Sequence, residues 1–184
     1  MDAVNFHTDS FSEILQQMVA SDGRSVWDVS MNQPVLIVFL RHFGCTFCRE
    51  ALSDLSKKHK EFKDRNVHLV LVHMSDKETA DRYFKKYKLK DFVAISDPEC
   101  HYYNVFGLTK GTMNQLFGLR VWMRGVEAGV MNGHGIGPML GDGFQMPGVF
   151  LVQSGEVRDK FVHKFASDRP DYKQLISCCS QGGL

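Results

Sequence analysis

The chain has 184 residues, of which 43% are hydrophobic, and its 22 lysines and arginines nearly balance its 21 aspartates and glutamates. This size and composition predict one domain with its own hydrophobic core, covering residues 1–184. A net charge of +1 provides no field that would draw the protein onto nucleic acid or an anionic membrane, so we expect neither as a partner.

The expected compartment follows from the N-terminus and the cysteines. The segment "MDAVNFHTDS" has no basic region followed by an apolar stretch, and the apolar runs of the chain are too short to span a bilayer. The five cysteines are unevenly placed, unlike the disulfide framework of a small secreted domain; they stand at 45, 48, 100, 178 and 179. We therefore expect a cytoplasmic protein with reduced thiols.

The first half of the chain alternates predicted helices and strands. Ser10 and Glu13 form a capping-box pattern that opens a helix, and "PVLIVFL" predicts a strand buried on both faces, as in the centre of a sheet. A helix is predicted from Cys45 onward, and "NVHLVLVHM" predicts a second buried strand. Ser75 and Glu78 form another capping-box pattern at the start of a second amphipathic helix. This order is typical of an α/β layer fold.

The second half adds three strands, two helices and one unusual segment. "FVAISDPECHYYNVFGL" predicts a short strand, a turn and a helix, and "QMPGVFLVQSGEVRDKFVHKF" predicts two strands joined by a tight turn. A helix is predicted in "SDRPDYKQLISCCS". Residues 107–145 are rich in glycine and methionine, and we predict that they contain an insertion within the domain. Its methionines and aromatic residues either cover the sheet or line an apolar groove over Cys45.

Two cysteines in C-x-x-C spacing, Cys45 and Cys48, stand at the predicted junction of a strand and a helix. Helix N–H groups and the positive end of the helix dipole favour a thiolate at Cys45, and Arg41, His42 and Arg49 add positive charge. Cys48, one helical turn further on, is placed to attack a mixed disulfide at Cys45. The pair therefore predicts dithiol exchange.

Two other interpretations of the cysteine pair stay open. A zinc site needs four ligands, so the pair would have to borrow from Cys178, Cys179 or a histidine, without the spacing of a finger or ribbon. Alternatively, the two thiols are buried structural side chains, because free cysteines are often fully buried.

Pro147 precedes the apolar strand in "QMPGVFLV", although the interior of a central strand normally excludes proline. A cis Met146–Pro147 bond would present an extended backbone that can pair with a substrate chain beside the thiols. A trans proline at the start of an edge strand is the alternative.

Taken in order, these features look like the thioredoxin fold, a central mixed sheet flanked by helices, here with an N-terminal helix and an insertion before the cis-proline strand. Four segments resemble more closely the peroxiredoxin-like 2 branch of the alkyl hydroperoxide reductase/thiol-specific antioxidant (AhpC/TSA) superfamily, which is similar to selenoprotein L and prostamide/prostaglandin F synthase. The segments are "FLRHFGCTFCRE", "SDPECHYYNVFGL", "GDGFQMPGVFLV" and "FVHKFASDRPDYKQLI".

The resemblance implies that Cys45 is the attacking, peroxidatic cysteine and that Cys48 resolves it. It also implies that Pro147 is the cis-proline that faces the two cysteines. We expect Phe47 and Met146, together with Pro147, to help bind or activate the substrate. The implied substrate is a peroxide, endoperoxide or disulfide, and the implied reductant is thioredoxin or a similar dithiol. No cofactor and no metal are expected.

The sequence departs from typical peroxiredoxins around the attacking cysteine. Those proteins resemble P-x-x-x-T-x-x-C, whereas here Val38 takes the proline position and His42 the threonine position, and "QMPG" stands where an arginine is expected. Arg41 or His42 would therefore have to activate a peroxide. Cys100 is either a second resolving cysteine or a partly buried structural one. A non-catalytic thioredoxin-like binding module is the alternative function.

Overall fold

The computed structural model describes residues 10–89, 92–118, 121, 123, 127 and 141–177. Five strands form one mixed sheet in the order β3-β2-β1-β4-β5. The first three strands are parallel, β4 is antiparallel to β1, and β5 is antiparallel to β4. Their bounds are Val35–Phe39 for β1, His68–His73 for β2, Val93–Ser96 for β3, Gly148–Gln153 for β4 and Glu156–Val162 for β5. Every residue of the central strand β1 is buried, which confirms the prediction from its apolar run.

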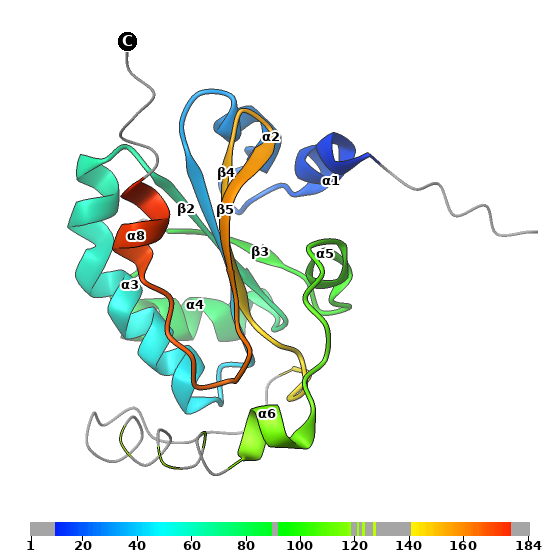
Figure 1. The fold of residues 1–184 in the computed structure, drawn as a ribbon. Helices are drawn as coiled ribbons and strands as arrows, with labels where there is room; N and C mark the ends of the chain where they lie inside the picture. The colour runs from blue at the N-terminus through cyan, green and yellow to red at the C-terminus, as the bar shows by residue number, and fades with distance from the viewer. Residues whose placement is uncertain are drawn as a thin grey trace, which may run out of the picture.

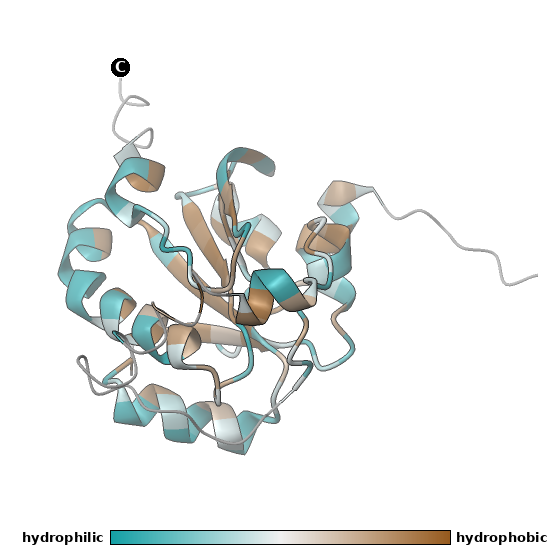
Figure 2. Ribbon diagram, turned by 60° about the horizontal axis from the view of Figure 1, so that its bottom comes forward, coloured by the Kyte–Doolittle hydropathy of each residue, from teal (hydrophilic) through white to brown (hydrophobic). Residues whose placement is uncertain are grey.

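Helices cover both faces of this sheet (Figure 1). One face carries α3 (Thr46–Asp64), α4 (Lys77–Lys86) and α8 (Tyr172–Ser177), while the other carries α1 (Phe11–Gln17), α2 (Val26–Ser30) and α5 (His101–Val105). Side chains of β1 alternate between the two resulting cores, as the pleat of a strand requires. The inner strands β1, β2 and β4 are largely apolar and the outward faces of α3 and α4 are hydrophilic (Figure 2), whereas β5 carries charged residues and is mostly exposed. The predicted thioredoxin-like fold is thus confirmed.

The two capping-box predictions have different outcomes. At α1, Ser10 and Glu13 form the predicted reciprocal pair. At α4, the prediction that Ser75 and Glu78 form the box is wrong, because Asp76 is the N-cap and accepts from the Thr79 N–H at 2.8 Å. The Ser75 carbonyl instead accepts from the hydroxyl of Ser96 at the end of β3, which places Ser75 in the preceding turn.

The expected cis bond before Pro147 is also wrong, because no peptide bond in the described residues is cis. The antiparallel ladder of β4 begins at Gly148, which pairs with Phe39 and with Val162. Pro147 stands one residue outside the ladder, where the missing N–H breaks no strand pairing. The trans alternative holds, but β4 lies between β1 and β5 and is not an edge strand.

The predicted 107–145 insertion falls partly outside the described residues. Its described part contains α6 (Met113–Phe117), a short helix with a capping box between Thr112 and Gln115. Neither this helix nor α2 was predicted from the sequence. No helix in the described ranges is both long and apolar enough to cross a membrane.

Candidate functional site

Cys45 is the N-cap of α3, immediately after the turn that follows the central strand. The Cys45 N–H donates to the carbonyl of His42 at 2.9 Å, and the Cys45 carbonyl accepts the first helical hydrogen bond from Arg49 at 3.2 Å. The turn and the helix therefore fix the backbone of Cys45 on both sides. Its side chain is half-buried.

Arg41 is the positive group that contacts this cysteine. Its side chain is buried, with 6% of the residue exposed, and its Nη1 donates to Cys45 Sγ at 3.1 Å. Nη2 donates to the carbonyl of Gly143 in the segment before β4. The Cys45 side chain accepts no capping hydrogen bond from the helix. The direct partner of a Cys45 thiolate is thus an arginine rather than the helix N–H groups that the sequence led us to expect.

Cys48 occupies a different environment one turn further along α3. It is 3% exposed, and burial raises its pKa strongly. A negative charge on Cys45 raises that pKa further, whereas Arg41 and Arg49 lower it. Cys48 therefore remains a protonated thiol at neutral pH, as expected of a resolving cysteine beside an attacking one.

His42 does not supply the predicted positive charge. Burial lowers its pKa to about 4, and the neighbouring guanidinium groups of Arg41 and Arg49 lower it as well, while Asp142 opposes them. The imidazole is therefore neutral at pH 7, and the expectation that it adds positive charge beside Cys45 is wrong. Its Nδ1 is buried and lacks a hydrogen-bond partner among the residues described.

Arg49 supports the turn that precedes α3. Its Nε donates to the Phe43 carbonyl at 2.9 Å, and its Nη2 donates to the Tyr83 hydroxyl at 3.1 Å. The guanidinium also lies 5.5 Å from the centre of the Tyr83 ring. Arg49 thus joins the turn to α4, and its positive charge lowers the pKa of Cys48.

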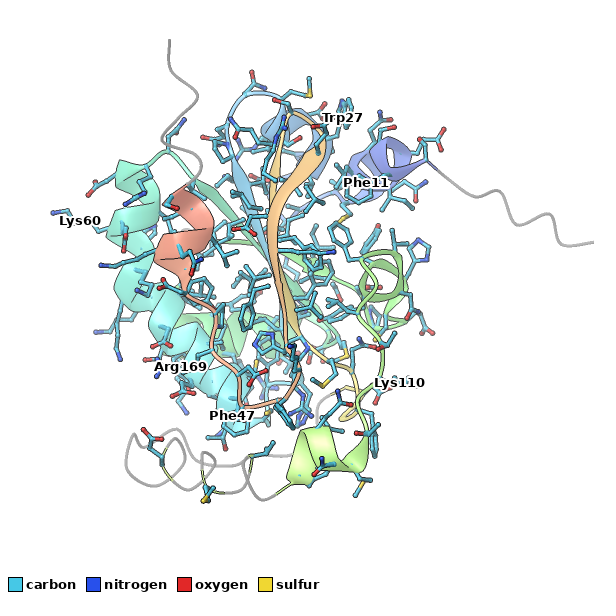
Figure 3. The ribbon with its side chains drawn as sticks, viewed as in Figure 1. Phe11, Trp27, Phe47, Lys60, Lys110 and Arg169 are labelled. Atoms are coloured by element: carbon cyan, nitrogen blue, oxygen red, sulfur yellow. The ribbon has the colours of Figure 1, made fainter. Side chains whose placement is uncertain are left out.

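Phe47 and Met146 lie on the apolar side of the site. Phe47 is partly buried at the end of α3 that faces α6 (Figure 3), and it packs against a small cluster that contains Leu116 of α6 and Met146. Pro147 and Cys48 line a cavity of about 30 Å³, which Arg41 and Phe47 also line; Cys45 is not among its lining residues.

The segment that carries Gly143 was not recognised as part of the site. It is held by an ion pair of 2.8 Å between Lys110 and Asp142, and by a hydrogen bond of 2.7 Å from the Gly111 N–H to the Phe144 carbonyl. Because Gly143 contributes a backbone carbonyl, its residue type carries no signal for this role in the sequence.

The remaining cysteines lie away from Cys45 and Cys48 or outside the residues that the structure describes. Cys100 is buried at the start of α5 and is free, as are Cys45 and Cys48. Residues 178 and 179 lie outside the described ranges. Within those ranges, no group of three or more His, Cys, Asp and Glu side chains is arranged to hold a metal ion.

The sheet order, with a cysteine at the turn between the central strand and its helix, defines a thioredoxin-like protein. The model of the AhpC/TSA family matches residues 16–160, so the chain belongs to that family.

Two curated relatives agree with this placement. The chain is 24% identical over 162 residues to "Thioredoxin-like protein AAED1, chloroplastic" of Arabidopsis thaliana, a match that covers 83% of this chain and 64% of the relative. It is 31% identical over 77 residues to "Peroxiredoxin-like 2C" of Bos taurus, covering 41% of this chain and 33% of the relative. The chain therefore matches less than two thirds of the length of either relative.

Solved structures share the fold at low sequence identity. The peroxiredoxin 6 of Arenicola marina superposes with a TM-score of 0.62 at 10% identity, covering 88% of this chain and 67% of that chain. The peroxidoxin BcpB of Mycobacterium tuberculosis superposes with a TM-score of 0.58 at 15% identity, covering 90% and 91%. These similarities show that the chain shares its fold with solved peroxiredoxins.

Proposed function

We propose that the protein is a thiol-dependent oxidoreductase that uses Cys45 as its nucleophile and Cys48 as its resolving cysteine. The observation that carries the proposal is the 3.1 Å contact between Arg41 Nη1 and Cys45 Sγ beside a buried Cys48. A guanidinium in contact with sulfur favours the thiolate, which is the nucleophilic form. Membership of the AhpC/TSA family supports this chemistry.

In the first step, the Cys45 thiolate attacks one oxygen of a peroxide. An S–O bond forms as the O–O bond breaks, and the second oxygen leaves as an alcohol or water after it gains a proton. Arg41, which contacts the sulfur, is placed to stabilise the charge that moves from sulfur to oxygen. Cys45 becomes a sulfenic acid, and the peroxide is reduced by two electrons.

In the second step, the Cys48 sulfur attacks the Cys45 sulfenic acid. An S–S bond forms, and the hydroxyl group leaves as water with the proton of Cys48. Conversion of Cys45 to a sulfenic acid removes the negative charge that raises the Cys48 pKa, so the resolving thiol becomes easier to deprotonate when it is needed. A small disulfide substrate would lead to the same product through a mixed disulfide.

An external dithiol then reduces the Cys45–Cys48 disulfide. We propose thioredoxin or a similar protein as that reductant. Cys45 is the more exposed of the two sulfurs, so it is the one that a reductant thiolate can attack, which leaves Cys48 to take up a proton.

To test the proposal, the reduced protein is treated with one equivalent of hydrogen peroxide, with and without the sulfenic-acid reagent dimedone. The modified cysteines are then identified by peptide mapping. Wild type should form a Cys45–Cys48 disulfide, and Cys48→Ser should carry dimedone on Cys45. Cys45→Ser should form neither product, whereas the control Cys100→Ser should behave as wild type. An unmodified Cys45 in the folded wild-type protein would exclude the proposed chemistry and favour a non-catalytic binding module.

A further inference from the structure

Tyr103 is a fully buried tyrosine whose hydroxyl reaches the strand ends beneath the site. It belongs to α5, on the face of the sheet opposite α3 (Figure 1). The hydroxyl donates to the Leu40 carbonyl at 2.6 Å and also lies 3.1 Å from the Val72 carbonyl. Its residue exposure is 0%. The hydroxyl therefore joins the carboxyl ends of β1 and β2, where the turn to Cys45 begins.

The Leu40 carbonyl belongs to the same peptide group as the Arg41 N–H. Because a peptide group is planar, a hydrogen bond that holds the carbonyl also orients the N–H and the following Cα. In a trans peptide the carbonyl and the N–H point to opposite sides of the C–N bond. Here the carbonyl meets Tyr103, while the Arg41 N–H faces the Cys48 thiol on the other side of the sheet.

The same peptide group also sets the starting direction of the Arg41 side chain. That side chain contacts Cys45 Sγ through Nη1. One planar unit therefore connects the Tyr103 hydroxyl to both cysteines, to Cys48 through the Arg41 backbone and to Cys45 through the Arg41 guanidinium.

The helix that carries Tyr103 is itself firmly anchored. Asp97 is buried at the end of β3, and its carboxylate accepts from the N–H groups of His101 and Tyr102 at 2.9 and 2.8 Å. The Tyr103 ring packs edge-on against Phe39 of the central strand, with 5.0 Å between the ring centres. A residue held in this way can impose an orientation on the Leu40–Arg41 peptide.

We infer that Tyr103 is a positioning residue for the dithiol, acting through the Leu40–Arg41 peptide to hold Arg41 against Cys45. This inference rests on the proposed function, since it assumes that Cys45 is the nucleophile and that Arg41 activates it. The described hydrogen bonds of the Tyr103 hydroxyl go to backbone carbonyls, so Tyr103 acts on Cys45 indirectly.

Tyr103→Phe and Tyr102→Phe form a matched pair for the test. Each substitution removes one hydroxyl from α5 that donates to a backbone carbonyl. The Tyr102 hydroxyl donates to the carbonyl of Gln17 in α1, at 3.1 Å, and not to the peptide before Arg41. The readout is the alkylation rate of Cys45 by iodoacetamide between pH 5 and 9, assigned by mass spectrometry. Tyr103→Phe should slow alkylation at pH 7 on the order of fivefold and move the profile to higher pH. Tyr102→Phe should match wild type.

The Arg41→Met background separates positioning from general loosening. If Tyr103 acts through Arg41, Tyr103→Phe should have no further effect once the guanidinium is gone. An equal effect in both backgrounds, or a wild-type profile for Tyr103→Phe alone, would overturn the inference. If Arg41→Met alone alkylates as fast as wild type, the proposed function fails instead, because Arg41 then does not activate Cys45.

A measurement on the unmodified sequence keeps the inference testable if Tyr103→Phe does not fold. Formation of the Cys45–Cys48 disulfide should shift the NMR signals of the Arg41 amide and the Tyr103 ring, and leave the Tyr102 ring unchanged, because coupling between two sites is reciprocal. A Tyr103 signal that does not respond to the disulfide would contradict the coupling.

Discussion

Cys45 and Cys100 occupy equivalent places in the chain and opposite electrostatic environments. Each follows a parallel strand of the sheet, each is the N-cap of a helix, and neither side chain makes a capping hydrogen bond. Cys45 has ordinary extended backbone angles and contacts the guanidinium of Arg41. Cys100 has a left-handed backbone, with φ of 56°, and faces acidic side chains.

The difference shows that two cysteines at helix N-termini can face charges of opposite sign. The pKa of Cys100 is raised by burial and then by the negative charges of Asp97 and Asp142, while Lys110 opposes them only in part. Asp97 already accepts the free N–H groups at the start of α5. The two helix N-termini thus differ in the nearest full charge, which is positive beside Cys45 and negative beside Cys100.

Removal of the positive charge beside Cys45 should have the largest effect. Arg41→Met should slow Cys45 alkylation at pH 7 by about ten- to a hundredfold, because a hydrogen bond to a charged group contributes about 1.5–3 kcal/mol. Arg41→Lys should give an intermediate rate, since it keeps the charge but loses the planar fork that also reaches Gly143. Stopped-flow alkylation with site assignment measures both variants. Equal rates for Arg41→Met and wild type would remove the proposed contrast with Cys100.

Acid should lower the free energy of unfolding through protonation of His42, which lies in the turn before Cys45. Its folded-state pKa is about 4, below the ordinary value of 6.5, so the unfolded chain binds a proton over that range and the folded protein does not. Stability present above pH 6.5 should therefore fall by about 1–2 kcal/mol as the pH drops toward 4, after allowance for solvent screening. Urea titrations at several pH values test this, and His42→Asn should flatten the acid limb. An identical acid limb in that variant would show that His42 is not responsible.

Neutralising the acidic group beside Cys100 should have a moderate effect. Asp97→Asn should raise the alkylation rate of Cys100 severalfold at pH 8, because a negative charge that opposes its thiolate is lost. The free energy of unfolding should fall by about 1–2 kcal/mol, since the amide accepts the α5 N–H groups less strongly. Mass-spectrometric alkylation and urea unfolding report the two quantities separately. A slower Cys100 would contradict the electrostatic explanation.

The smallest effect is expected from removal of Cys100 itself. Cys100→Ser should leave the Cys45 alkylation rate within about twofold of wild type and should leave Cys45–Cys48 disulfide formation unchanged. Alkylation and peptide mapping of the single variant measure both. A loss of disulfide formation would identify Cys100 as a second resolving cysteine, the alternative that its sequence position left open.

The elements around Cys45 could be predicted because their signals are local. An apolar run, a turn and a C-x-x-C pair specify a strand, a junction and a helix within a few residues, and Arg41 was recognised beside them. The charge state of His42 was not predictable, since it depends on how deeply the fold buries that side chain. Ser75 was mistaken for the helix cap, whereas the neighbouring Asp76 is the N-cap and Ser75 lies in the preceding turn, where its carbonyl accepts from Ser96.

The contacts that position the site could not be predicted from the sequence for a related reason. The Tyr103 hydroxyl meets the Leu40 carbonyl across 63 residues of sequence, and Arg41 Nη2 meets the Gly143 carbonyl across 102. Backbone acceptors carry no residue-type signal, so only the folded topology brings these groups together. The trans bond before Pro147 likewise depends on where the β4 ladder begins.

The position of β1 between β2 and β4 also governs the order in which the chain can assemble. Its parallel neighbour is complete at His73, but its antiparallel neighbour ends only at Gln153. During synthesis one edge of the strand that precedes Arg41 stays unpaired until more than a hundred further residues have been added. Such an edge is a template for wrong pairing, and contacts this distant in sequence form slowly. Arg41 is thus synthesised early but reaches its position beside Cys45 only late in folding. The reactivity of Cys45 can therefore report the completion of folding.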